Sequence, residues 1–345
     1  MRRRDFITFL GGTAASWPLA ARGQPKAARL GVLLFSSSDP QLPIIQDHLQ
    51  ELGYVPGKNL LATQRDGDGS YERLPQFAAE LVAEKPDLLL ALGGDVAPYA
   101  AKATSTIPIV FVSSADPVRL GLAASLARPS HNATGVTLLL DDTASKRLEL
   151  IKEVVPRVQR TAFLWNPDHP DNELVEAQRA APALNMELQF VELRGPKDLE
   201  NALQALSEAR PDALYVVSSR YTVLNIPRIA EFAKAKRIPL AGGWGAWARA
   251  GGLLSFGPDT TEMARRAAEY VDKILKGAKP ADLPVQQPTK FELIINAKAA
   301  REMGIEVSPT LLARADEVID SVRADVCYWH LADIADAPTN VCFWG

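Results

Sequence analysis

The feature that most constrains this chain is a regular alternation of short, wholly apolar segments with amphipathic segments of helical period. From Arg29 onward, apolar runs such as Leu88–Leu92 and Ile107–Val112 are each bounded by turn-forming residues. Strands that are apolar on both faces and alternate with helices are typical of a parallel sheet covered on both sides. The pattern predicts an α/β fold of the doubly wound, Rossmann-like class.

The alternation occurs twice along the chain. It runs to the segment NATGVTLL around residue 135 and then starts again with a helical segment over 145–156 and an apolar strand over 161–165. A single (β/α)8 barrel would need eight regular units without such a restart. A chain of 345 residues, 47% of them hydrophobic, is long enough for two compact domains. We therefore expect two open α/β lobes in series.

Small polar loops follow the predicted strands, at the edge where an open parallel sheet binds ligands. Serine hydroxyls and loop amides can hold a carboxylate, Asp95 or Asp116 can take a cation, and Trp244 or Tyr221 can cover a flat apolar group. Asp116 precedes Pro117 and can equally begin a helix, so its role stays open. The candidate ligand-binding residues are Ser36, Ser37, Ser38, Gly94, Asp95, Ser113, Ser114, Asp116, Asn166, Ser218, Ser219, Tyr221 and Trp244.

Several function classes find no support in the composition. The charges are balanced at a net −3, with no basic patch that predicts a nucleic-acid partner. The four histidines are scattered, with no visible set of nucleophile, histidine and acid. A glycine pattern over 243–248 lacks the acid of a dinucleotide site, and the turn at 66–69 lacks the later ligands of a calcium loop. We expect no enzyme, no metal and no cofactor.

The N-terminus has the anatomy of an export signal. A basic head is followed by a modest apolar stretch that ends in small residues, and Arg3 and Arg4 with the following DFI resemble a twin-arginine signal. No apolar run reaches the roughly 18 residues of a membrane-spanning helix. The sequence predicts a signal peptide over 1–23, cleaved near residues 21–24, and a periplasmic protein.

The C-terminal segment 321–345 differs from the rest of the chain. It holds both cysteines, Cys327 and Cys342, so the body has no thiol nucleophile and no disulfide. Cys327, His330 and Cys342 match no standard metal spacing and lack a fourth ligand, while a disulfide between the two cysteines remains open. We expect a non-functional, poorly ordered extension.

Six segments, in order, resemble one known family. The resemblance runs from about Arg29 to Asp320 and is to bacterial ABC-transporter substrate-binding proteins of the tryptophan/tyrosine type. The segments are ELGYVPGKNL, YERLPQFAAELV, ATSTIPIVFVSSADPV, GLAASLARPSHNATGV, KRLELIKEVVP and YVDKILKGAKPADLPVQQPTKFELIINAKAAREMGI.

The resemblance implies a periplasmic-binding-protein type I fold whose lobes close on a small ligand. By analogy, lobe 1 comprises 28–137 plus 257–284, and lobe 2 comprises 138–256 plus 285–320. The three crossovers then lie near 138–140, 256–258 and 285–287. It also implies a monomer that delivers a small organic ligand, such as an aromatic or other amino acid, to an ABC permease in the inner membrane.

Two rival functions remain compatible with the same fold. One is the ligand-binding part of a sensor, in which a signalling partner replaces the permease. The other is an enzyme, a hydrolase or a racemase. Fold analogy alone does not separate them from the importer function.

Overall fold

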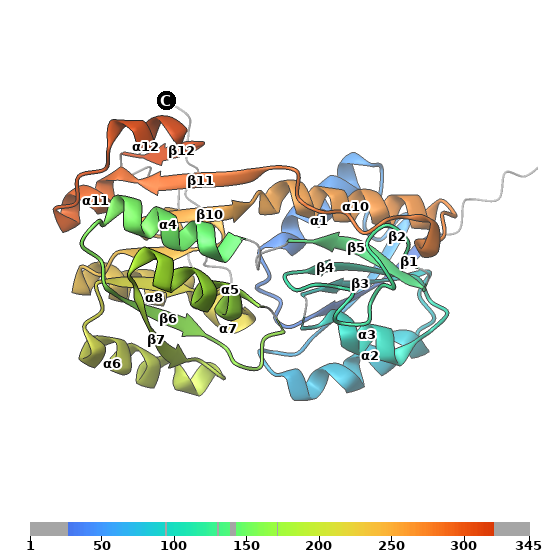
Figure 1. Ribbon diagram of the computed structural model, residues 1–345. Coiled ribbons are helices and arrows are strands. Elements are labelled where there is room, and N and C mark those ends of the chain that lie inside the picture. The colour runs from blue at the N-terminus through green and yellow to red at the C-terminus, as the bar shows by residue number, and fades with distance from the viewer. Residues whose placement is uncertain (1–26, 94, 130, 139–142, 171, 321–345) are drawn as a thin grey trace, which may run out of the picture.

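The computed structural model describes residues 27–93, 95–129, 131–138, 143–170 and 172–320. They form two α/β lobes that lie side by side, each built on its own sheet (Figure 1). The predicted export signal (1–23) and the atypical tail (321–345) fall outside the described residues. None of the helices in the described ranges has the length and hydrophobicity that crossing a membrane requires.

The first lobe holds a five-stranded parallel sheet in the order β2-β1-β3-β4-β5. All residues of β3 and β4 are buried, as the apolar sequence of β3 and of β4 up to Val112 predicts. The elements of this lobe are β1 (Ala28–Leu34), α1 (Gln41–Glu51), β2 (Leu60–Asp66), the 3-10 turn η1 (Tyr71–Arg73), α2 (Leu74–Ala83), β3 (Leu88–Leu92), α3 (Ala97–Ala103), β4 (Ile109–Ser113), β5 (Ala133–Thr137), α10 (Thr260–Leu275) and η5 (Pro280–Asp282).

The second lobe holds a seven-stranded sheet in the order β12-β11-β10-β9-β8-β6-β7. Within it, β11 runs antiparallel to β10 and the other pairs are parallel. Its elements are α4 (Ala144–Val154), β6 (Arg160–Trp165), α5 (Glu173–Ala180), η3 (Ala181–Leu184), β7 (Glu187–Glu192), η4 (Pro196–Asp198), α6 (Leu199–Ala209), β8 (Ala213–Val216), α7 (Arg220–Leu224), α8 (Ile226–Lys236), β9 (Leu240–Gly242), α9 (Gly245–Arg249), β10 (Leu254–Pro258), β11 (Phe291–Asn296), α11 (Ala297–Met303), α12 (Pro309–Arg314) and β12 (Glu317–Ile319).

The helix α10 returns to the first lobe from the second. Its N-cap Asp259 accepts hydrogen bonds from the backbone N–H groups of Thr261 and Glu262, both at 3.0 Å, which satisfies two otherwise unpaired donors. Buried residues such as Met263, Ala267 and Val271, spaced four apart, form the apolar face that covers the first sheet.

The chain passes between the lobes at three places. It leaves β5 for α4, leaves β10 for α10, and returns to β11 after Gln286. The backbone of Gln286 pairs with Gly135 and Thr137, both at 2.9 Å, so this segment lies along the edge of the first sheet. The second lobe's sheet extends through Pro258. The predicted fold class, two doubly wound α/β lobes, is confirmed.

Candidate functional site

The strand order places one crevice on each lobe at a defined point. The first sheet reads 2-1-3-4-5, and the strands β7-β6-β8-β9-β10 of the second sheet repeat that order. In such sheets the connections leaving the two central strands go to opposite faces, and the crevice between them binds ligands. The crevices lie after β1 and β3 in the first lobe and after β6 and β8 in the second. The residues that follow these four strands are therefore the candidates for a site.

One ionisable side chain from each of these four loops joins a buried network across the lobe interface. Arg220, after β8, donates through Nη1 to Asp39 Oδ2 and, at 3.4 Å, through Nε to Asp95 Oδ1. Asp39 follows β1 and Asp95 follows β3, and their residues are 4% and 9% exposed. The two acids belong to the first lobe and the arginine to the second, so these ion pairs hold the lobes together.

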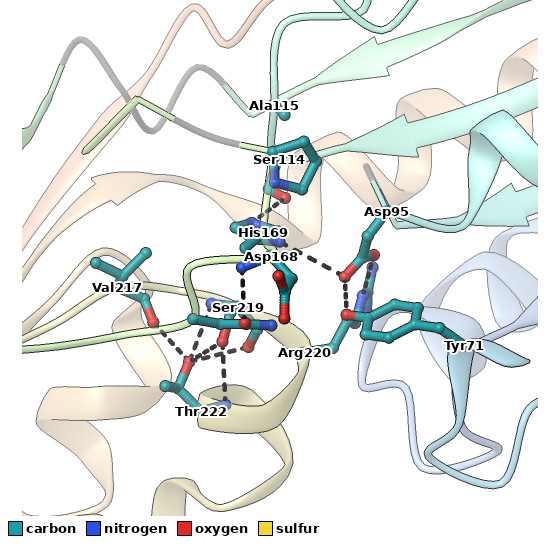
Figure 2. Close-up of polar contacts among 12 residues, drawn as sticks. Tyr71, Asp95, Ser114, Ala115, Asp168, His169, Val217, Ser219, Arg220 and Thr222 are labelled. Atoms are coloured by element: carbon teal, nitrogen blue, oxygen red, sulfur yellow. Dashed lines mark hydrogen bonds and ion pairs between the residues drawn. The ribbon is translucent and has the colours of Figure 1, made fainter. Parts of the chain in front are cut away.

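His169, after β6, completes the network from the second lobe. Figure 2 shows it between Ser114 and Asp95: its Nε2 lies 3.2 Å from Ser114 Oγ, and its Nδ1 lies 3.5 Å from Asp95 Oδ2. The hydroxyl of Tyr71 donates to the same Oδ2 (Figure 2). Asp95 is thus contacted by both lobes and is the centre of the network.

The network shifts the pKa values of three of its members, Asp95, Tyr71 and Arg220. Burial by itself raises the pKa of the Asp95 carboxyl, but the hydrogen bond with His169 and the charge of Arg220 outweigh it and hold that pKa well below its usual value. Burial and the neighbouring Asp95 charge raise the pKa of the Tyr71 hydroxyl far above its usual value. Burial by itself lowers the pKa of the Arg220 guanidinium, but the charges of Asp39 and Asp95 outweigh it and keep that pKa above its usual value. The result is a buried carboxylate paired with a charged guanidinium.

Position 93, next to this network, requires a glycine. Gly93 has φ = +126°, in the region that favours glycine, and a Cβ there would lie 2.4 Å from Arg220 Nη2. The guanidinium therefore packs directly against the backbone that ends β3.

Three aromatic rings flank the charges. Phe35 lies 4.5 Å from Tyr71 and 5.3 Å from Tyr221 between ring centroids, and the two tyrosines are 5.8 Å apart. Both contacts of Tyr221 are edge-on, the geometry that aromatic pairs favour. Because Tyr221 comes from the second lobe and the other two rings from the first, this cluster also bridges the cleft.

Two small hollows lie between the lobes, and Arg220 lines both. The first has about 240 Å³ of unfilled space and admits no water-sized sphere; the second has about 200 Å³. The first is lined by Gln41, Val112, Ser114, Leu138, Ser218, Ser219, Arg220, Val223 and Trp244. The second is lined by Phe35, Ser36, Asp39, Pro40, Arg220, Val223 and Leu224. Arg220 and Val223 are the residues common to both linings.

Several residues predicted from the sequence lie at this interface. Asp95 and Tyr221 belong to the charged network and the aromatic cluster. Ser114, Ser218, Ser219 and Trp244 line the first hollow, and Ser36 lines the second.

Other predicted residues serve local structure. The Asp116 carboxylate is exposed and accepts from the backbone N–H of Val118 at 2.8 Å, so it caps its own turn. Ser113 Oγ donates to the carbonyl of Ala115 at 2.7 Å. Ser38 donates its backbone N–H to Ser36 Oγ at 3.3 Å, while Ser37 is exposed.

Two predicted residues combine a cap with burial, and one is not described. The side chain of Ser219 caps α7 in a capping box with Thr222. Asn166 Oδ1 accepts from the backbone N–H of Asp168 at 3.0 Å, and Asn166 is buried. Gly94 lies outside the described residues.

Sequence reasoning missed Asp39, Gln41, Tyr71, His169 and Arg220 as site residues. Asp39 and Arg220 stood in the loops identified after strands, and their charge was the available signal, since a charged residue at a strand's carboxyl end faces the crevice. Tyr71 and Gln41 begin helices further along and carried no such signal.

No group of three or more histidine, cysteine, aspartate or glutamate residues within the described ranges is arranged to hold a metal ion. What the site offers is buried paired charge, hydroxyls and aromatic faces, brought together from two lobes. These are the groups that fix the orientation of a small polar ligand.

Comparisons with known proteins agree with this architecture. The family profile of the ABC transporter substrate binding protein matches residues 35–319. The chain is 26% identical over 260 residues to a tyrosine-binding protein of Clostridioides difficile (strain R20291), covering 75% of this chain and 74% of that protein.

Two solved structures share the fold across both lobes. A conserved domain protein from Vibrio cholerae is 29% identical with a TM-score of 0.77, covering 85% of this chain and 100% of that one. An ABC domain from Streptococcus pneumonia in complex with L-Trp is 25% identical with the same TM-score and the same coverage. These likenesses confirm the resemblance to the tryptophan/tyrosine type and the periplasmic-binding-protein type I fold. The chain belongs to the ABC transporter substrate-binding protein family.

Proposed function

We propose that the ligand of this substrate-binding protein is a free amino acid with an aromatic or other apolar side chain, bound at the lobe interface around Arg220. The single observation that carries the proposal is the pairing of two buried carboxylates, Asp39 and Asp95, with one guanidinium where the lobes meet. Asp39, Asp95 and Arg220 together carry one surplus negative charge. A ligand ammonium balances it, and burying a cation without such a partner is prohibitively unfavourable.

The rest of an amino acid also finds partners here. The rings of Phe35, Tyr71 and Tyr221 offer apolar faces and edges beside the acids. The similar proteins named above include one described as tyrosine-binding and one in complex with L-Trp, which supports the same ligand class.

Closure of the lobes is the step that ligand binding controls. Contacts made by both lobes to one ligand exist only when the lobes meet, so the ligand binds the closed arrangement more tightly and shifts the population toward it. The closed shape is then presented to the permease of the ABC transporter. No covalent step is needed, and we propose that the chain is not an enzyme and acts as a monomer.

We further propose that the chain works in the periplasm after twin-arginine export. The support is the sequence of residues 1–23, with Arg3 and Arg4 ahead of an apolar stretch. Changing both to lysine should leave the full-length protein in the cytoplasmic fraction, whereas periplasmic recovery of that variant contradicts the proposal.

Thermal-shift measurements against the aromatic and branched L-amino acids test the ligand class. A ligand at 100 times its dissociation constant stabilises a protein by about 2.7 kcal/mol. At least one of these amino acids should raise the melting temperature of the wild-type chain.

The matched variants are Asp95→Asn and Asp116→Asn. They make the same chemical change at a buried network residue and at an exposed turn residue. The shift should disappear in Asp95→Asn and persist in Asp116→Asn. A panel without any shift, or an equal response of the two variants, refutes the proposal.

A further inference from the structure

Four polar atoms of three buried side chains surround the first hollow without a hydrogen-bond partner among the described residues. They are Nε2 and Oε1 of Gln41, Oγ of Ser218 and Nε1 of Trp244. The three residues are only 2%, 3% and 4% exposed. Gln41 begins α1 in the first lobe, whereas Ser218 and Trp244 follow β8 and β9 in the second.

These atoms make the lobe interface sensitive to what lies in the hollow. A buried polar group without a partner destabilises a structure, because it has lost its hydrogen bonds to water and gained none in return. The hollow admits no water-sized sphere, so solvent cannot satisfy these groups while the lobes lie this close. Parting the lobes exposes them to water, and in the closed arrangement a ligand group with matching acceptors pairs the three donors among them, Gln41 Nε2, Ser218 Oγ and Trp244 Nε1.

The donors around the hollow define the chemistry of that group. The Trp244 indole N–H and the Arg220 guanidinium can only donate, and Gln41 and Ser218 each have a donor available. Among the described residues, no carboxylate side chain lines this hollow, whereas Asp39 lines the second hollow. An acceptor-rich, negatively charged ligand group therefore pairs the donors of the first hollow, and a cationic group fits the second hollow beside Asp39.

We propose that Gln41, Ser218 and Trp244 form the subsite for the carboxylate of the bound ligand, with Gln41 as its specificity-determining residue. The ligand's ammonium then points toward Asp39 and Asp95, and Arg220 lies between its two charged ends. This inference rests on the proposed amino-acid ligand and specifies which end of it each lobe holds. A bound carboxylate keeps the lobes slightly farther apart than they lie here.

Isothermal titration calorimetry with three probes tests the subsite: L-tryptophan, its amide and tryptamine, which lacks the carboxylate. Wild-type protein should bind L-tryptophan at least about 100-fold more tightly than tryptamine, since two or more hydrogen bonds to a charged group are lost. Gln41→Leu and Trp244→Phe should each weaken L-tryptophan about tenfold or more and leave tryptamine within about threefold.

Gln41→Glu tests the subsite by adding a charge that repels the ligand carboxylate instead of a group that binds it. It puts a negative charge where the ligand carboxylate would lie, at a helix start where an acid is tolerated. Binding of L-tryptophan should fall more than that of its amide, and binding of tryptamine should be kept or improved. A purely structural role for Gln41 would affect all three probes alike.

The controls are Gln46→Leu and Trp247→Phe. Gln46 is exposed on the same helix as Gln41. Trp247 is buried three residues from Trp244, but it is not among the residues that line the hollow. Both should retain the preference of wild type for the carboxylate. Equal weakening of all probes by the subsite variants, or unchanged L-tryptophan affinity, overturns the subsite.

Failure of the ligand class is distinguishable from failure of the subsite. If wild type binds none of the amino acids, the proposed function fails, and the subsite is then tested by thermal shift with benzoate and phenylacetate. Stabilisation by either carboxylate that is lost in Gln41→Glu supports the subsite, and its absence refutes it.

Discussion

Replacing Arg220 by methionine should open the lobes. Arg220 lies between two buried carboxylates, and its Nε is 3.4 Å from Asp95 Oδ1. At an effective dielectric constant near 20, one such pair contributes about 5 kcal/mol of Coulomb attraction, and removing one partner of a buried pair destabilises by about 3–5 kcal/mol. In Arg220→Met the penalty falls mainly on the closed arrangement, because opening lets water reach Asp39 and Asp95.

A penalty of about 3 kcal/mol corresponds to roughly 150-fold in the equilibrium between open and closed forms. Small-angle X-ray scattering should therefore give a larger radius of gyration for Arg220→Met. Calorimetry should show an affinity for L-tryptophan lower by about two orders of magnitude. The melting temperature should change less than the affinity does, because each lobe keeps its own core.

The control is Arg228→Met, which removes an ion pair with Glu200 whose side chains are 57% and 73% exposed. Exposed pairs contribute about 0–1 kcal/mol, so this variant should match wild type in radius and affinity. Adding Asp39→Asn and Asp95→Asn to Arg220→Met should restore compactness, because no uncompensated charge is left. An Arg220→Met protein as compact and as tight-binding as wild type refutes the reasoning.

Three further predictions concern stability. The Asp95 pKa is depressed in the folded protein, so ionised Asp95 adds to the free energy of unfolding at any pH above its usual pKa near 4. That added stability is lost as the pH falls below about 4. In urea unfolding, the stability of Asp95→Asn should therefore decrease less with acidification than that of wild type. A Cβ on Gly257 would lie 1.7 Å from the Gly243 carbonyl oxygen, so Gly257→Ala should lower the free energy of unfolding by about 3 kcal/mol or more, whereas Gly195→Ala, whose nearest neighbour is at 3.7 Å, should not. Deleting 321–345 should leave the melting temperature unchanged, and a clear decrease would give the tail a structural role.

The secondary structure and its grouping into lobes followed from local patterns. Wholly apolar segments such as Leu88–Leu92 can be buried only in a sheet covered on both faces, and the helix over 260–275 carries its apolar residues on one side. The restart near residue 135 separated the two sheets. These features depend on a few neighbouring residues, which is why the sequence reveals them.

Which of the loop residues belong to the site was not decided by local sequence patterns. Ser113 ends a strand, and Asp116 and Asp95 follow strands; the three looked alike in sequence, but the first two bond to their own turns. Whether a loop polar group bonds locally or reaches the other lobe is decided by backbone conformation and by the angle between lobes.

By itself, therefore, the sequence determined two doubly wound lobes and the set of loops that can meet. The tertiary structure alone decided that Arg220 pairs with Asp39, 181 residues away, and that Gln41 faces Ser218 and Trp244 across the interface. The reason is that a contact between lobes depends on how two separately folded sheets are oriented, and no local periodicity in either one records that orientation.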